Sequence, residues 1–252
     1  MNSTSTIWLF AISSVVLVSL VSLVSIVALA ISGSRLKQAV FVMVSLAVGA
    51  MFGDAFIHLL PESFENPRAK AATSLYVLAG IFAFFFLEKF LLWRHQHTFE
   101  SADHIHPVGY MNLIADGVHN LMDGVLIGAS YLISLQIGLA TTAAVLLHEI
   151  PQEIGDFGVL LHAGFTKKRA LLFNFLSATL AMLGTVIALA VGSGVSGFVA
   201  VVLPLGAGGF IYIAGSDLIP ELNKELKPSK SLLQLASMGL GVGLMLLLSL
   251  LD

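Results

Sequence analysis

The chain has 252 residues, of which 57% are hydrophobic and only 11% are charged, and its mean hydropathy is +0.95. A soluble domain carries about 25% charged residues, so this chain lacks the polar side chains that would cover a soluble enzyme or keep a disordered chain in solution. The chain has 12 Lys and Arg against 15 Asp and Glu, a net charge of −3. It therefore lacks the excess of basic residues that is typical of nucleic-acid-binding proteins. The remaining class is an all-α, polytopic membrane protein in a lipid bilayer.

Eight segments are long enough to cross the bilayer, since a spanning helix needs roughly 20 apolar residues. They are expected to form a single transmembrane domain over 1–252, with helices at about 7–31, 39–60, 74–93, 108–131, 136–162, 169–193, 197–219 and 231–251. The first is expected to be a span and not a cleaved signal peptide, because no Lys or Arg precedes it. In the last, Gly239, Gly241 and Gly243 are expected to allow close helix packing.

Basic residues concentrate in alternate connections and so indicate an orientation. The connections after segments 1, 3, 5 and 7 hold ten of the twelve Lys and Arg, and the opposite face has only Arg68 and Lys70. Because Lys and Arg are enriched in cytoplasmic loops, these connections are expected to be cytoplasmic and both termini extracytoplasmic. The loop at 94–107, which contains four histidines, is then cytoplasmic. It either binds ions that leave the pore or is a solvent-exposed loop without a metal-binding role. The plasma (cell inner) membrane is expected, since no targeting segment is visible.

Four segments carry ionisable and amide side chains at depths where polar groups are costly. An Asp at the middle of a spanning helix costs about 2.5–3.5 kcal/mol on insertion scales. Several such groups at one depth are typical of ion or proton pathways, and the alternative is a hydrogen-bond network that joins helices. The groups are Asp54, His58 and Glu62 in segment 2; Asp116, His119, Asn120 and Asp123 in segment 4; His148, Glu149, Gln152, Glu153, Asp156 and His162 in segment 5; and Asp217 and Glu221 in segment 7.

Helical spacing sorts the residues of segments 4 and 5 into narrow stripes, because i, i+3, i+4 and i+7 share a face. The stripes are His119 with Asp123 and the adjacent Asn120, His148 with Gln152, and Glu149 with Glu153 and Asp156. Without any cysteine, a metal would have only N and O ligands and Met, and a mixed His, carboxylate and amide set suits divalent first-row ions. Pro151 either kinks segment 5 or frees the carbonyl of Leu147 to line a cavity, and both can hold.

One short pattern occurs twice, in segments that run in opposite directions. Residues 58–62 and 217–221 both read polar, apolar, apolar, Pro, Glu. Paired elements of inverted direction are typical of transporter folds, so the two ends are expected at opposite membrane faces. The outer approach would consist of Asp54, His58 and Glu62, and the inner exit of Asp217 and Glu221.

Two motifs carry a family resemblance. Residues 119–124 read HNLMDG and residues 148–156 read HEIPQEIGD. They resemble the HNxxDG and HEXPHEXGD motifs on the fourth and fifth helices of the Zrt-/Irt-like (ZIP) family of divalent metal transporters. Residues 53–61 and 208–221 resemble the second and seventh helices of the same branch. The one clear departure is Gln152, which stands where the signature has His.

The resemblance implies an inverted-repeat bundle of eight helices that carries zinc, or possibly iron, manganese or cadmium, into the cytoplasm as substrate and not as cofactor. It also implies a binuclear site whose ligands are His119, Asn120, Asp123, His148, Glu149 and Gln152. An additional polar ligand is expected at Asn174, on segment 6. The ion would enter past Asp54 and His58 and leave along Glu153, Asp156 and His162.

Two other functions are alternatives to metal transport. A proton- or cation-coupled carrier of an organic substrate would use the carboxylates as a proton relay, but the residues cluster as metal ligands do. An intramembrane metalloprotease needs HExxH, and the second His is absent at Gln152. The chain is therefore expected not to be an enzyme. Small residues on its helices would permit a homodimer.

Overall fold

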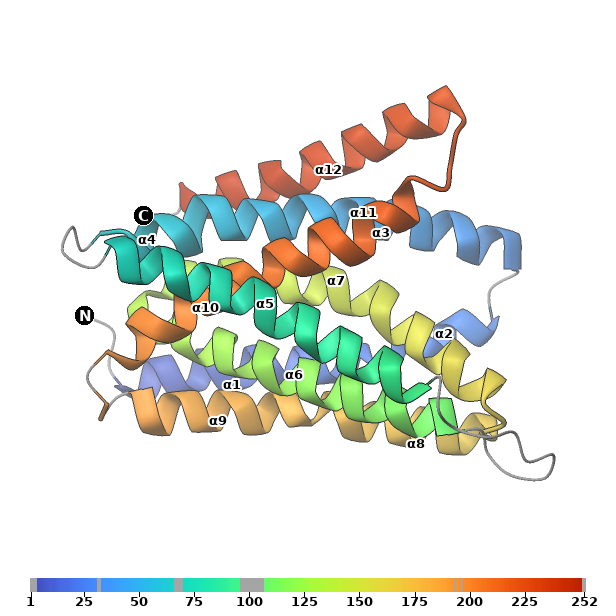
Figure 1. Cartoon of the computed structure of the whole chain (residues 1–252), viewed down its shortest axis with the longest axis horizontal. Coiled ribbons are helices and arrows are strands. Elements are labelled where there is room, and N and C mark those ends of the chain that lie inside the picture. The colour runs from blue at the N-terminus through green and yellow to red at the C-terminus, as the bar shows by residue number, and fades with distance from the viewer. Residues whose placement is uncertain are drawn as a thin grey trace.

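The computed structural model describes residues 4–30, 33–65, 70–95, 107–192, 194–195 and 197–250. Its long helices run side by side along one axis, and the described residues contain no strand (Figure 1). Large apolar side chains cover much of the outside, for example Phe82 at 64% and Leu240 at 69% exposure, as helices that face lipid require. The all-α, polytopic membrane class is confirmed. The four-histidine loop lies largely outside the described residues.

In the described part of the chain, the helices form eight consecutive rods, several of them interrupted. The rods are α1 (Thr4–Val21) with α2 (Val24–Ala30); α3 (Gly33–Gly53) with the π-helix η1 (Asp54–Leu59) and α4 (Leu60–Ser63); α5 (Lys70–His95); α6 (Pro107–Ile133); α7 (Leu135–His162); α8 (Lys167–Ala178) with α9 (Leu180–Gly192); α10 (Phe198–Tyr212) with the π-helix η2 (Ile213–Leu218) and α11 (Ile219–Leu222); and α12 (Pro228–Ser249).

Within the described residues, five stretches are long and apolar enough to cross a membrane. They are Thr4–Val27, Arg35–Ser63, Lys167–Gly192, Phe198–Leu222 and Pro228–Ser249. The helices α6 and α7 are longer than several of these, at 27 and 28 residues, but carry the carboxylates that make them less apolar. The two helices that carry these carboxylates thus lie among strongly apolar ones.

A one-residue connection aligns α6 and α7 as an antiparallel hairpin. Ser134 caps α7, because its hydroxyl accepts a hydrogen bond from the Ile137 N–H at 3.1 Å. Nearby, the Thr141 hydroxyl donates to the Ser130 hydroxyl across the hairpin, at 3.1 Å. The tight turn fixes the register of the two helices, so their polar stretches lie at the same depth.

Glycines bring the helix backbones together at three crossings. A Cβ added to Gly124 of α6 would lie 1.9 Å from the Ala181 carbonyl oxygen of α9, and one on Gly80 of α5 would lie 2.0 Å from a backbone oxygen of α10. On α12, only Gly241 approaches a backbone in this way, 2.3 Å from the Leu46 oxygen of α3. The expectation for Gly239 and Gly243 is wrong, since a Cβ on either would meet open space.

Candidate metal site

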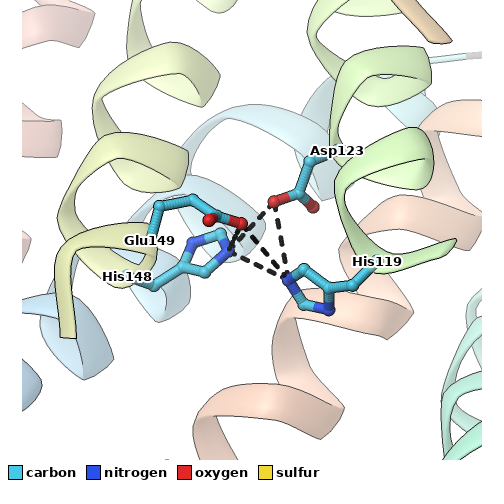
Figure 2. Close-up of side chains that lie close together, drawn as sticks. All are labelled: His119, Asp123, His148 and Glu149. Carbon is cyan, nitrogen blue, oxygen red and sulfur yellow. Dashed lines mark hydrogen bonds and ion pairs between the residues drawn. The ribbon is translucent and has the colours of Figure 1, made fainter. Parts of the chain in front are cut away.

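Four side chains from the α6–α7 hairpin meet inside the bundle. His119 and Asp123 are one turn apart on α6, and His148 and Glu149 are consecutive on α7. Figure 2 shows the four pointing toward one another across the interface of the two helices, and one ligand atom from each lies within 4.8 Å of the others. Asp123, His148 and Glu149 are buried, and His119 is half-buried. We call these residues the four-residue cluster.

Five of the six distances between the ligand atoms are close to the edges of a small tetrahedron. The His148 Nε2 is 3.0 Å from the Asp123 Oδ2, 3.3 Å from the His119 Nε2 and 3.7 Å from the Glu149 Oε1. The His119 Nε2 is 3.6 Å from the same Asp123 oxygen and 3.8 Å from the same Glu149 oxygen. Zinc bonds of about 2.0–2.2 Å give a tetrahedron with edges of roughly 3.3–3.6 Å. The cluster can therefore hold a divalent ion with little movement.

The surroundings of His148 prepare it as a ligand. Its Nδ1 lies 3.0 Å from the Ala144 carbonyl oxygen, so Nδ1–H donates there and the lone pair of Nε2 faces the cluster. The ring of Phe210 meets the His148 ring edge-on at 5.8 Å, and Phe84 meets His119 in the same way at 6.0 Å. Because these two apolar rings exclude water and lower the local dielectric, electrostatic interactions inside the cluster are stronger than in water. Pro151 does not end α7, which continues through it to His162.

The remaining two predicted ligands, Asn120 and Gln152, lie outside this four-residue group. The Asn120 Nδ2 donates to the Asp116 carboxylate at 2.8 Å and to the Asp116 carbonyl at 3.1 Å. Gln152 is half-buried and lines the neighbouring cavity. The six expected ligands are thus divided between four side chains that share one centre and two that lie outside it, Asn120 on Asp116 and Gln152 on the neighbouring cavity.

A polar cavity of about 480 Å³ adjoins the cluster on one side. Its lining extends from His119 to Asp217 and Glu221, which are exposed at its far end. Between them it is lined by Asn112, Asp116, Gln152 and Asp156. We call it the acidic cavity. It connects the cluster to the end of the bundle where α11 ends and α12 begins (Figure 1).

A small cavity of about 100 Å³, lined by Asp123, Phe84 and Phe210 among others, adjoins the cluster on another side. A larger cavity, of about 620 Å³, is lined by Glu62 and Glu65 at the other end of the bundle and shares no lining residue with the acidic cavity. Asp54 and His58 of η1 are buried, with the His58 Nδ1 3.2 Å from the Asp54 Oδ1. This pair lines none of the three cavities.

Three other predicted pathway residues lie in different surroundings. Glu153 is buried beside α8, where the Nδ2 of the buried Asn174 donates to both its carboxylate and its carbonyl oxygen. His162 is exposed at the last residue of α7 and is absent from the acidic-cavity lining. Asp156 lines the acidic cavity, where its Oδ1 accepts a hydrogen bond from the Asn112 Nδ2 at 3.1 Å.

The sequence reasoning missed two residues that complete these contacts. Asn112 lies one turn before Asp116, so helical spacing could have placed it on the stripe of His119 and Asp123. Ser177 of α8 donates a hydrogen bond to the Asp116 carboxylate. No local pattern indicates Ser177, because its partner is 61 residues away in the chain.

Comparisons with known proteins agree with this arrangement. The chain matches the family profile described as ZIP Zinc transporter over residues 5–108 and 94–249. It is 37% identical to Zinc transporter ZIP13 of Pongo abelii, over 86% of this chain and 67% of the relative. It is 31% identical to Zinc transporter zipt-7.1 of Caenorhabditis briggsae (99% and 81%) and 30% identical to Zinc transporter SLC39A7 of Canis lupus familiaris (98% and 72%). The chain therefore belongs to the ZIP zinc transporter family, a family of transporters and not of enzymes.

Proposed function

We propose that the protein carries Zn²⁺ across the membrane toward the cytoplasm, with His119, Asp123, His148 and Glu149 as its central ligands. The observation that carries the proposal is the meeting of two imidazole nitrogens and two carboxylate oxygens at tetrahedral spacing, beside a polar cavity. Its relatives are named zinc transporters, which supports zinc as the cargo.

The donor set suits an ion that has to leave again. Imidazole and carboxylate ligands bind zinc, but a site without thiolates has a lower zinc affinity than an all-Cys site. Transport requires binding that is strong enough to admit the ion and weak enough to release it. His148 and His119 favour zinc over the harder ions Mg²⁺ and Ca²⁺, which prefer oxygen.

The proposed route begins at Asp54 and His58 and ends in the acidic cavity. From the four-residue cluster the ion would pass Asp116 and Asp156 before it reaches Asp217 at the exposed end. Each step offers a carboxylate, and the cavity admits water that replaces the lost ligands. The second metal position expected at Asn120, Glu149 and Gln152 stays a prediction, as does the exit past His162.

We propose that the acidic cavity opens to the cytoplasm. Its exposed end lies near the connection with Lys224, Lys227 and Lys230, on the side that the distribution of basic residues assigns to the cytoplasm. Both termini lie at the opposite end of the bundle, the proposed extracytoplasmic side (Figure 1). Epitope tags at either terminus should then be accessible on intact cells. The plasma membrane and a homodimer stay predictions, which fluorescence localisation and cross-linking in membranes would test.

The proposal is tested by ⁶⁵Zn²⁺ uptake into proteoliposomes of the purified protein, with Fe²⁺, Mn²⁺ and Cd²⁺ as competitors. Saturable uptake is expected, and it should disappear in both His119→Ala and His148→Ala, with size-exclusion profiles like that of the wild type. Full uptake by both folded variants would refute the ligand assignment. No uptake by the wild type would favour the organic-substrate carrier.

A further inference from the structure

Three consecutive basic residues begin the α8–α9 rod, at the end of the bundle where α12 also begins (Figure 1, right). They are Lys167, Lys168 and Arg169, and all three are exposed. We call them the basic corner. The rod from Lys167 to Gly192 is long and apolar enough to cross a membrane, so the basic corner lies where this span reaches the membrane surface.

A small apolar core fixes the position of the basic corner. Phe165, in the turn between α7 and α8, is buried in this core, which both helices share, and its ring meets the Tyr110 ring of α6 edge-on at 5.2 Å. Gly164, with a φ of 92°, lets the chain reverse there, because this left-handed conformation favours glycine. Thr166 then caps α8, since its hydroxyl accepts a hydrogen bond from the Arg169 N–H at 3.4 Å. The three basic residues are therefore attached to a folded turn that contacts three helices.

The helix face that carries two of these charges continues into a face that meets lipid. Leu172 is 54% exposed and lies three residues after Arg169 and four after Lys168, so the three side chains share one face. Leu176, at 49% exposure, continues this face one turn further. Because the Cα–Cβ bonds of a helix tilt toward its N-terminus, the basic side chains extend away from the leucines, toward the phosphate level of the bilayer. The exposed Tyr110 lies at the same level, as aromatic residues at membrane interfaces do.

The charges of the basic corner have no counter-charge within the described residues. None of the three side chains forms an ion pair there. The next basic connection at this end differs, because Lys224 pairs with Glu221 and Lys230 pairs with Glu225. The positive end of the α8 dipole adds to the uncompensated charge of the basic corner. An anion from outside the chain would supply the missing counter-charge and accept hydrogen bonds from the N–H groups that the first turn of a helix leaves unpaired.

We propose that the basic corner binds the phosphate group of an anionic phospholipid. The charge favours a headgroup with net negative charge over a zwitterionic one, and the exposed leucines below it contact the acyl chains of the same molecule. A free phosphate ion would match only the first of these two features. This end of the bundle is the one proposed to face the cytoplasm, where the leaflet carries anionic lipids. The inference does not depend on zinc transport or on the four-residue cluster.

Native mass spectrometry of the full-length protein in detergent tests the proposal, because it resolves single bound lipids. The protein is titrated separately with phosphatidylglycerol, which is anionic, and with phosphatidylcholine, which is zwitterionic. The first phosphatidylglycerol should bind at least about fivefold more tightly, which is roughly the contribution of one basic residue at a membrane surface. The triple variant Lys167→Gln, Lys168→Gln, Arg169→Gln should bind the two lipids equally.

The matched control is the triple variant Lys224→Gln, Lys227→Gln, Lys230→Gln, which removes the same charge at the same end of the bundle. It should retain the preference for phosphatidylglycerol, and both triple variants should keep the size-exclusion profile and the zinc Kd of the wild type. Equal affinity of the wild type for the two lipids would overturn the inference. An equal loss of preference in both triple variants would also overturn it, by showing a diffuse effect of charge. A parallel titration with inorganic phosphate distinguishes the two sources of the anion: binding as tight as that of phosphatidylglycerol would refute a lipid as the occupant.

Discussion

Gln152→His restores the residue that the family signature has at this position, and the structure indicates what it should change. Gln152 lies one turn beyond His148 on α7, three residues after Glu149, and its half-buried side chain lines the acidic cavity beside His119. Residues at i and i+4 of a helix have Cβ atoms about 5–6 Å apart, so an imidazole at 152 would reach the exit side of the four-residue cluster. There it would offer the ion an additional nitrogen.

The added ligand should tighten zinc binding by about tenfold, which corresponds to about 1.4 kcal/mol. Because the four-residue cluster already supplies a tetrahedral set, this gain is smaller than the loss from removing His148. Affinity changes of this kind act mostly on dissociation, so zinc release into the acidic cavity should slow by a similar factor. We expect a lower KM for uptake together with a lower maximal rate.

Isothermal titration with Zn²⁺ measures the affinity, and ⁶⁵Zn²⁺ uptake into proteoliposomes measures the rate. Gln152→Ala is the control: it removes the amide but none of the four cluster ligands, so its zinc Kd should stay within about threefold of the wild type. An unchanged Kd in Gln152→His would refute the placement of residue 152 at the exit side. A large loss in Gln152→Ala would show instead that the amide is a ligand.

Three further outcomes follow from the structure. Gly124→Ala would push a methyl group into the α9 backbone and should destabilise the protein by about 1–3 kcal/mol, whereas Gly158→Ala, with open space beside it, should not; thermal unfolding in detergent checks both. His58→Ala should lower the rate of zinc uptake while the zinc Kd stays unchanged, and a changed Kd would place His58 at the central site. The hydrogen bond from Lys230 lowers the pKa of the Glu225 carboxyl, so the pairing stabilises the fold above the ordinary Glu pKa and is lost as pH falls through the lowered value. Lys230→Ala should return the pKa of Glu225 toward its usual range, as carboxyl-carbon NMR titration would detect.

The core of the site could be predicted because it depends on local geometry. His119 and Asp123 share a helix face by spacing alone, and a polar face on an otherwise apolar helix has to meet another polar face. The polar stretch of α7 around His148 and Glu149 is expected at the same depth. Helical periodicity and the cost of exposing charge to lipid were therefore sufficient to predict that these two stretches meet, whereas the choice of individual ligands came from the resemblance to the family motifs.

The separation of Asn120 from the four-residue cluster could not be predicted, because it depends on how each helix is rotated about its axis. Asn120 follows His119 directly, yet a step of one residue turns the side chain by about 100°, and it contacts Asp116 of its own helix instead of the cluster. The contact of Ser177 with Asp116 is set by the crossing of α6 with the α8–α9 rod, and no sequence spacing records it. Gly124 is part of that crossing, since only a residue without a Cβ permits it.

The repeated polar–apolar–apolar–Pro–Glu pattern has a structural counterpart that the sequence alone did not indicate. In each copy a π-helix precedes the proline: η1 ends before Leu60, whose N–H bonds to the Ala55 carbonyl, and η2 ends before Ile219, whose N–H bonds to the Ala214 carbonyl. A proline cannot donate to the helix and its ring crowds the carbonyl four residues before it. The wider π turn relieves that crowding, so the same short pattern produces the same local deviation twice.

The two copies differ in what surrounds them. His58 of η1 is only 6% exposed, whereas its counterpart Asp217 in η2 is exposed and lines the acidic cavity. The glutamates that end the two copies differ less, since Glu62 and Glu221 each line a cavity at their own end of the bundle. The same short pattern thus gives the same π turn twice, but the packing of the neighbouring helices decides whether the first residue of the pattern is buried.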